Sequence, residues 1–168
     1  MNLKLKILLL SLMGYSNFLT AQTCNPTILS TTPDNQFIDN LDGTVTDIST
    51  GLIWMRCSLG QSWDGTTCEG IATAYSWKDA LFNADQSNFA DKTWQLPNIK
   101  ELQNIVEESC TAPSVNLTIF PNTMIDKYWS STPKGNSESS VWLVPFTTGI
   151  SAGGSKNIPY FVRLVSHQ

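Results

Sequence analysis

The fold of this chain is decided by residues 39–54, which read DNLDGTVTDISTGLIW. Short β-prone runs flank the Asp42-Gly43 pair, which predicts a two-residue type I′ hairpin because that turn needs positive φ at both positions. A second turn is predicted at residues 49–51, and residues 52–55 are predicted to form a third, more buried strand. The stretch therefore predicts an antiparallel β-meander that opens the folded domain.

Two short helices are predicted after the meander. A capping-box pattern begins at Ser76, ahead of apolar residues at helical spacing, and predicts a helix over residues 77–84. Asn98 with Glu101 repeats the pattern and predicts a second helix that ends near Glu108. We expect Glu101 to cap this helix rather than to act as a catalytic carboxylate.

The last third of the chain is predicted to return to strands and loops. Residues 128–132, 141–146 and 160–165 are rich in aromatic and β-branched side chains, which is typical of strands. The SAGGS sequence at 151–155 indicates a flexible loop, and Arg163 is expected to pair with an acidic group. Strands, helices and further strands in this order predict an α+β domain. Three tryptophans in or beside these segments are expected in the core: Trp54, Trp94 and Trp129.

The first residues have the pattern of a secretory signal peptide. Two lysines precede a short apolar run over residues 7–13, and Ala21 supplies a small residue before a cleavage site. The apolar run is too short for a membrane span, which takes about 20 residues. We expect a signal peptide over 1–21, an extended N-terminal arm over 22–35 and one folded domain over 36–168.

Composition and charge exclude several classes of function. The chain has 168 residues, with 10 basic and 14 acidic side chains and one histidine. Its formal charge of −4 argues against nucleic-acid binding, which needs a basic face for the phosphates. No stretch after the leader is apolar enough to span a membrane. We therefore expect a secreted, periplasmic or cell-surface protein.

The four cysteines are typical of an exported chain, in which disulfides persist. Four cysteines allow three pairings. The glycine-containing loop between Cys57 and Cys68 favours a bond between those two, which leaves Cys24 with Cys110. A zinc site would need short Cys-x-x-Cys pairs or nearby histidines, and the sequence has neither.

Several motifs, taken in their order along the chain, resemble one bacterial domain family. They are residues 39–54, residues 56–65, WQLPNIKEL at 94–102, YWSST at 128–132 and VRLV at 162–165. Together they resemble the Lcl C-terminal domain of collagen-like adhesins across about residues 36–165. The resemblance implies a C-type lectin-like fold. In those adhesins the domain is associated with binding of sulfated glycans at cell surfaces and with trimer assembly, which implies a homo-oligomer.

This chain differs from those adhesins in two features that bear on its ligand. It lacks a collagen-like Gly-X-Y stalk, and its acidic balance does not supply the basic face that sulfated polymers need. The calcium-binding triplets of C-type lectins are also absent from the sequence. We expect an exported, non-enzymatic adhesion module that binds a glycan or a surface protein. The alternatives are a structural subunit of a larger surface assembly and a carboxylate-dependent hydrolase.

The loop between the second and third cysteines carries the first candidate binding site. Gln61, Trp63 and Asp64 lie together there. An exposed indole can stack on the apolar face of a sugar ring while amide and carboxylate neighbours bind its hydroxyl groups. The alternative is that Trp63 packs onto the domain and only holds its own loop.

The hairpin carries the second candidate site. Asp39, Asn40, Asp42 and Asp47 crowd around Gly43 and offer the oxygen ligands that Ca²⁺ prefers. The spacing of an EF-hand loop fails, however, when Gly43 is set at its central glycine position. We therefore favour turn chemistry for these residues over a calcium site, and we expect no cofactor.

Overall fold

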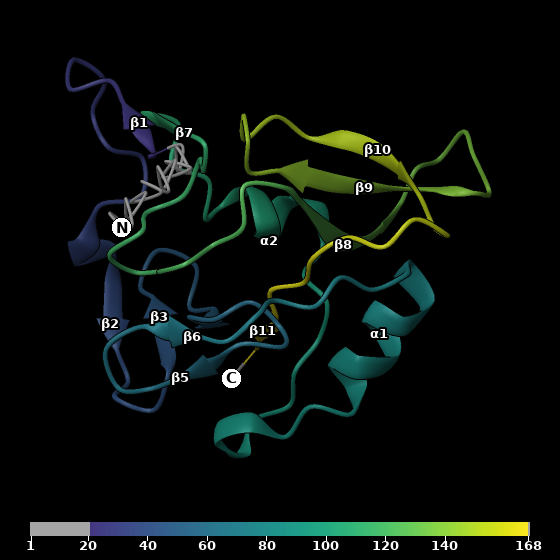
Figure 1. The fold of residues 1–168 in the computed structure, drawn as a ribbon, viewed down its shortest axis with the longest axis horizontal. Helices are drawn as coiled ribbons and strands as arrows, with labels where there is room; N and C mark the ends of the chain where they lie inside the picture. Colours follow the sequence, from purple (N-terminus) through teal and green to yellow (C-terminus); the bar gives the residue numbers. More distant parts are fainter. Residues whose placement is uncertain (1–20, 168) are drawn as a thin grey trace, which may run out of the picture.

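The computed structural model of the chain describes residues 21–167. The predicted signal peptide, apart from Ala21, lies outside the described residues. Within the described part, no helix is long and apolar enough to cross a membrane. The structure is of the predicted α+β class, with small antiparallel sheets and two α-helices (Figure 1). Two disulfides crosslink it.

The elements follow one another in a simple order along the chain. The strands before the helices are β1 (Thr23–Cys24), β2 (Phe37–Asp39), β3 (Thr44–Asp47), β4 (Ile53–Met55), β5 (Ser62–Trp63) and β6 (Cys68–Glu69). The helices are α1 (Trp77–Asp85) and α2 (Ile99–Gln103), with single 3-10 turns at Asp34–Gln36 and Phe89–Asp91. The later strands are β7 (Cys110–Thr111), β8 (Lys127–Pro133), β9 (Ser140–Pro145), β10 (Ala152–Ser155) and β11 (Val165–Ser166).

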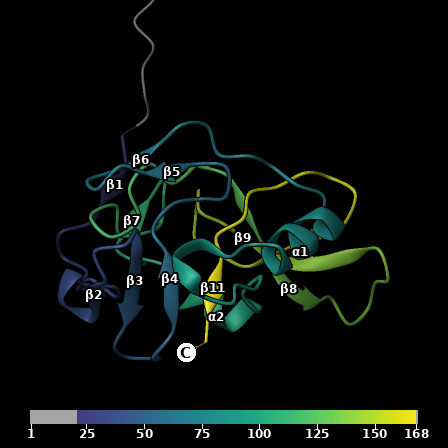
Figure 2. The same ribbon diagram turned by 90° about the horizontal axis from the view of Figure 1, so that it is seen from below.

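The predicted meander is confirmed. β2, β3 and β4 pair antiparallel in sequence order, and β11 joins beside β4 to complete a four-stranded sheet (Figure 2). Val45 of β3 lies opposite Trp54 of β4, and both side chains are buried. Alternate residues of β4 face two different clusters: Trp54 packs with Val45 in one, and Ile53 and Met55 pack in the other, so both faces of this strand are buried.

The predicted type I′ turn at Asp42-Gly43 is wrong, although the hairpin forms. The strands are joined by residues 40–43, and positive φ occurs at Leu41 and Gly43 instead. The Asp42 carboxylate accepts a hydrogen bond from the Thr44 backbone N–H at 2.9 Å. This Asx-type turn gives the hairpin its longer, four-residue connection.

The sequence at 151–155 forms an edge strand rather than the predicted flexible loop. β8, β9 and β10 make a three-stranded antiparallel sheet, in which Ala152 lies opposite Leu143. A Cβ atom at Gly154 would overlap the Leu143 side chain. Close packing therefore requires glycine at this strand, and the predicted flexibility is wrong.

The C-terminal segment is strand only at its end, so the predicted strand over 160–165 is mostly wrong. Tyr160 and Phe161 make single bridges to Tyr75 and Tyr128, and regular pairing begins at Val165. The segment instead runs between the two larger sheets and bonds to each in turn. The backbone N–H groups of Met55, Leu59 and Trp129 donate to it.

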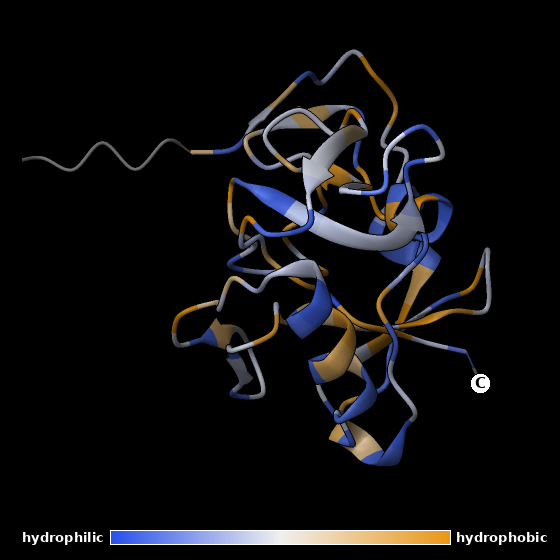
Figure 3. Ribbon diagram, turned by 90° about the vertical axis from the view of Figure 1, so that its right-hand side faces the viewer, coloured by the Kyte–Doolittle hydropathy of each residue, from blue (hydrophilic) through white to orange (hydrophobic). Residues whose placement is uncertain are grey.

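The two helices form at the predicted places, but the second is shorter than expected. α1 presents both hydrophobic and hydrophilic residues, as an amphipathic helix should (Figure 3). The capping box of α2 is present, because Asn98 and Glu101 each bond the backbone N–H of the other. α2 ends at Gln103, five residues before Glu108. The chain leaves the helix there because Val106 pairs with Val115 and Glu107 turns inward.

The core confirms the expected tryptophans and corrects the expectation for Arg163. Trp54, Trp94 and Trp129 are all buried. Arg163 is fully buried but forms no salt bridge among the described residues. It donates to backbone carbonyls of Met55 and Arg56 and, at 2.7 Å, to Thr123 Oγ1. Burial lowers the pKa of Arg163 to about 10. Carbonyl and hydroxyl oxygens, rather than a carboxylate, stabilise this internal cation.

Both predicted disulfides are confirmed, as Cys24–Cys110 and Cys57–Cys68. The N-terminal segment over residues 22–35 packs onto the rest of the domain, because β1 pairs with β7 beside the first disulfide. The Gln22 amide nitrogen donates to the carbonyls of Pro113 and Val115, at 2.6 and 2.7 Å. The arm is thus an ordered part of the domain.

Candidate functional site

A disulfide-closed loop over residues 57–68 carries three of the residues singled out from the sequence. β5 and β6 form a small hairpin within and just after it, in which Trp63 lies opposite Cys68. The Asn122 side chain donates to the Cys68 carbonyl at 2.7 Å and fastens the hairpin to the domain. The loop is therefore held both covalently and by hydrogen bonding, so its side chains are presented in a fixed position.

A groove of about 270 Å³ lies against this loop. Its walls combine apolar and polar side chains, and none of its lining residues carries a charge. The apolar side chains that argue for a binding role are Met55, Leu59, Trp63 and Phe89. The polar ones are Ser58, Gln61, Ser62 and Ser87. An apolar surface with a few polar groups is typical of sites for small organic ligands.

The indole of Trp63 is fixed from one side by Arg56. The guanidinium carbon of Arg56 lies 4.1 Å from the ring centroid, and the guanidinium bonds Asp39 at 2.7 Å. Arg56 does not line the groove, whereas Trp63 does. Trp63 therefore both packs onto the domain, as the alternative interpretation held, and contributes ring surface to the groove.

The structure brings Gln61 to the same groove and leaves Asp64 out of it. Gln61 Oε1 accepts from the Ser58 backbone N–H at 3.1 Å. The Asp64 carboxylate accepts from the backbone N–H groups of Thr67 and Thr66, which lowers its pKa. Asp64 stabilises the tip of its own loop, so two of the three residues converge on the groove and the third is a turn residue.

The residues proposed for calcium are separated by the turns they form. Asp39 bonds the Leu41 N–H and Arg56, and the buried Asp47 accepts from the backbone and hydroxyl of Ser49. The Asn40 side chain bonds the hydroxyl groups of Thr44 and Thr46. Over residues 21–167, no three His, Cys, Asp or Glu side chains gather in a way that could hold a metal ion.

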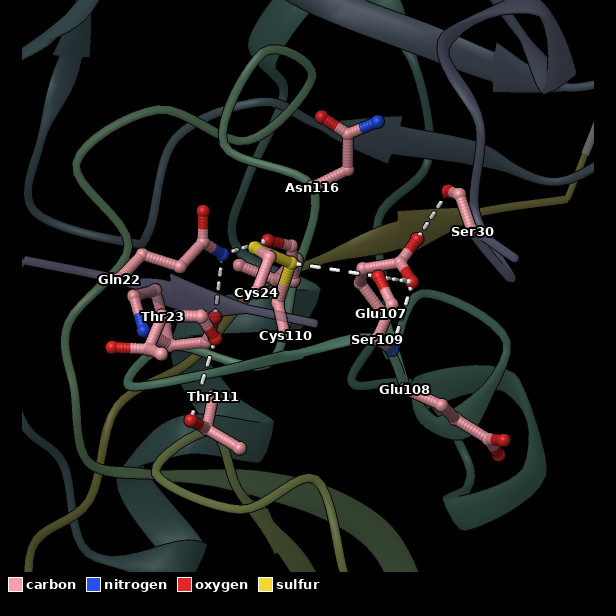
Figure 4. The surroundings of a disulfide bond; sticks show 12 residues. Gln22, Thr23, Cys24, Ser30, Glu107, Glu108, Ser109, Cys110, Thr111 and Asn116 are labelled. Atoms are coloured by element: carbon pink, nitrogen blue, oxygen red, sulfur yellow. Dashed lines mark hydrogen bonds between the residues drawn. A yellow bond between two sulfur atoms is a disulfide. The ribbon is translucent and has the colours of Figure 1, made fainter. Parts of the chain in front are cut away.

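A buried carboxylate beside the Cys24–Cys110 disulfide escaped the sequence analysis (Figure 4). Glu107 is only 3% exposed and has no cationic partner among the described residues. It accepts from the Ser30 hydroxyl at 2.5 Å, the Thr32 N–H at 2.9 Å and the Ser109 hydroxyl at 2.6 Å. One carboxylate therefore joins the N-terminal arm to the segment that follows α2.

The hydrogen bonds to Glu107 decide its charge state. Burial by itself would raise the pKa of this carboxyl group. Hydroxyl donors from Ser109 and Ser30, with the backbone N–H groups of Thr32 and Ser109, outweigh burial and hold the pKa well below its usual range. The only sequence signal for this arrangement is the Ser-Thr-Thr run at 30–32, which lies 75 residues or more from its acceptor.

The single histidine of the chain, His167, also acquires a partner. His167 Nε2 lies 2.9 Å from Glu101 Oε1, while the other oxygen of Glu101 caps α2. Both residues line a groove of about 430 Å³ at the opposite end of the capped helix from Glu107. Glu101 thus has the capping role predicted for it and a second contact that needed the fold.

Comparison with known proteins gives one match. No curated protein and no solved structure matches the chain, so the C-type lectin-like aspect of the fold stays a prediction. The family model that matches is described as the Lcl C-terminal domain, and it covers residues 43–166 of the 168-residue chain. β3 and β4 of the meander, both helices and the closing strand β11 fall within this match, and β2 precedes it. The chain therefore belongs to the Lcl C-terminal domain family, an adhesin-associated family of domains.

Proposed function

We propose that this protein is an exported, non-enzymatic binding module that recognises a carbohydrate at the groove formed by Trp63 and Gln61. The observation that carries the proposal is the fixed indole of Trp63, which Arg56 holds from one side while the ring lines the groove. Two disulfides support export, since such bonds persist outside the cytoplasm. Family membership supports an adhesin-associated, extracellular role.

The chemistry of the groove suits a sugar. An indole face packs against the C–H groups of a pyranose ring, and amide and hydroxyl groups beside it bond the sugar hydroxyls. Gln61 and three serines provide such polar groups here. The volume of about 270 Å³ is near the lower end for ligand sites, roughly 300 Å³, which suits one or two sugar rings.

The electrostatics of the groove favour a neutral glycan over a sulfated one. No lining residue is charged, and Arg56, the cation stacked on Trp63, is already paired with Asp39. A sulfate group transferred into this groove would therefore lose hydration without gaining an ionic partner. The ligand that we propose is a short neutral saccharide, in contrast to the sulfated polymers associated with the collagen-like adhesins.

A glycan array that includes neutral and sulfated saccharides tests this function. We expect the wild-type protein to bind neutral glycans and Trp63→Ala to lose up to about tenfold in affinity, because an aromatic contact contributes about 0.5–1.5 kcal/mol. Trp142→Ala is the matched control. Its indole is likewise stacked by a cation, Lys134 at 5.0 Å, but it lies outside the groove.

Two results would contradict the proposal. Trp63→Ala could retain full binding while its unfolding temperature stays at the wild-type value. Alternatively, the wild-type protein could bind sulfated glycans only, in a manner that high salt abolishes. The unfolding temperature of each variant separates a lost contact from a lost fold.

A further inference from the structure

One edge of the β8–β10 sheet is covered and the other is open. At β8 the C-terminal segment takes up the edge, because the Trp129 N–H donates to the Phe161 carbonyl at 2.9 Å and the Phe161 N–H donates to the Lys127 carbonyl at 3.0 Å. β10 forms the opposite edge, and no described strand pairs with its outer side (Figure 1). A further strand can therefore be added to the sheet at β10.

The register of β10 shows which of its backbone groups point away from β9. Gly153 lies opposite Trp142 in this register. Just beyond the strand, the Lys156 N–H donates to the Ser139 carbonyl at 3.0 Å, so every second residue back from Lys156 bonds to β9. The residues between them, Gly153 and Ser155, direct their backbone groups outward. Over the described part of the chain, neither the N–H nor the C=O of Gly153 has a hydrogen-bond partner.

A lysine side chain lies across the strand at the same position. A Cβ atom at Gly153 would come within 3.0 Å of Lys134 Nζ and 3.1 Å of Lys134 Cδ. The Lys134 ammonium also lies 5.0 Å from the centroid of the Trp142 ring, which belongs to the neighbouring strand β9. Lys134 therefore packs over Trp142 and Gly153, and glycine at 153 leaves the space that this side chain occupies. The packing holds a positive charge at the open edge.

The charges around this edge are positive and lack carboxylate partners. Lys156 directly follows β10, and its ammonium lies 4.8 Å from the Trp77 ring centroid and donates to the backbone carbonyl of Glu138. Neither Lys134 nor Lys156 forms a salt bridge within the described residues. From residue 127 onward the sequence has four basic side chains and one acidic side chain, that of Glu138, although the chain as a whole is acidic. The local field therefore favours a negatively charged partner.

We propose that β10 docks an extended, acidic segment of a partner protein, which adds as a fourth strand beside Gly153. The backbone of that segment bonds the N–H and C=O of Gly153, and an aspartate or glutamate opposite Gly153 projects to the face on which Lys134 lies. A sulfated polysaccharide can contact the lysines, but it does not match an N–H and a C=O group side by side on a strand edge. The edge therefore favours a peptide over a polyanionic glycan, and the inference is independent of the proposed sugar site.

Backbone NMR of the isotope-labelled protein with two synthetic peptides tests the proposal. The probe is an eight-residue peptide of alternating glutamate and valine with blocked ends, and the control replaces each glutamate by lysine. We expect saturable binding of the acidic peptide, with a chemical-shift change and slower hydrogen exchange at the Gly153 amide. The lysine peptide should bind more weakly, because its side chains repel Lys134 and Lys156.

Two matched pairs of variants locate the site. Lys134→Met should weaken binding of the acidic peptide about threefold, as loss of an exposed ion pair does, whereas Lys92→Met, at a groove beside His167, should leave it unchanged. Gly153→Ala should displace Lys134 and also weaken binding. Gly135→Ala, in which the new methyl group meets open space, should not. The unfolding temperature of each variant separates a lost contact from a lost fold.

Four results would overturn the proposal. The Gly153 amide could stay unchanged at saturating acidic peptide, or the two peptides could bind with equal affinity. Protection of Gly153 that grows with protein concentration in the absence of peptide would assign the edge to a second copy of the chain. Binding of dextran sulfate without any binding of the acidic peptide would assign the lysines to a polyanion.

Discussion

The two disulfide-closed regions of this protein differ in what surrounds the covalent bond. Beside Cys24–Cys110, one buried carboxylate collects hydrogen bonds from the N-terminal arm and from the segment after α2 (Figure 4). Beside Cys57–Cys68, the hairpin borders an uncharged groove in which Trp63 is held by Arg56. The first region directs its polar groups to one another, and the second leaves ring and polar surface on the wall of the groove.

This difference shows that the position of a disulfide does not by itself reveal the role of the region that it closes. Glu107 can be buried and charged only because its carboxylate accepts a full set of hydrogen bonds. The hydroxyl and N–H groups that donate these bonds are then not available to a ligand. The Trp63 loop is fastened at its ends by the disulfide and by Asn122, so its middle is presented without being covered. Preorganisation of this kind lowers the entropy cost of binding.

The largest expected effect comes from breaking each crosslink separately. The chain-entropy relation predicts a loss of about 4.5 kcal/mol for Cys24→Ser with Cys110→Ser, which opens a separation of 86 residues. Cys57→Ser with Cys68→Ser opens a separation of 11 and should cost about 3 kcal/mol. Denaturant unfolding measures both losses. We expect glycan binding to fall only in the variant that lacks the Cys57–Cys68 bond. An equal fall in both double variants would show that the two disulfide-closed regions do not differ in this respect.

The next effect tests the buried carboxylate. Glu107→Gln should lower the free energy of unfolding at pH 7 by about 3 kcal/mol, because the amide NH₂ would face the donors that the carboxylate now accepts from. Glu108→Gln, a change at the neighbouring exposed residue, is the matched control. A loss of similar size in both variants would show that Glu107 has no special role.

The same carboxylate predicts a pH dependence. The folded-state pKa of Glu107 is depressed, so its stabilisation is present above the unfolded pKa, near 4.3, and is lost as the pH falls through and below that value. One such group contributes a slope of at most about 1.4 kcal/mol per pH unit. Unfolding measured between pH 6 and pH 2 should show a shallower slope in Glu107→Gln than in the wild type.

The smallest effect compares two glycines of the meander. Gly43 and Gly51 both have positive φ, of 85° and 73°, so alanine strains either backbone. A Cβ at Gly43 would also lie 2.9 Å from Trp63 Cβ, whereas the space at Gly51 is open. We expect Gly51→Ala to cost about 1 kcal/mol and Gly43→Ala about 2 kcal/mol. Glycan binding should weaken only in Gly43→Ala. Equal glycan binding by the two variants would show that the contact between Gly43 and Trp63 does not affect the groove.

Much of the fold could be predicted from local patterns. The meander, the cap of α2 at Asn98 and the disulfide pairing follow from residues near one another or from elimination among four cysteines. The errors occurred where packing overrides local preference. Residues 151–155 became a strand because glycine fits beneath Leu143, and residues 162–164 run between two sheets without regular pairing in either.

The candidate site was predicted in part for the same reason. Gln61 and Trp63 share one short loop, so their proximity was visible in the sequence. Asp64 lies in the same loop, but its carboxylate is taken up by the turn. The contribution of Phe89 to the groove had no local signal, since only the folded chain brings it to the groove that Trp63 lines.

The sequence by itself determined the order of the elements, the helix caps and the export-compatible cysteines, because these signals act over a few neighbouring residues. Only the tertiary structure decided that Glu107 would bind Thr32, 75 residues away, and that His167 would meet Glu101, 66 residues away. Contacts at such separations depend on which surfaces the core brings together. A carboxylate, a hydroxyl or an imidazole has no role of its own until packing supplies its partner.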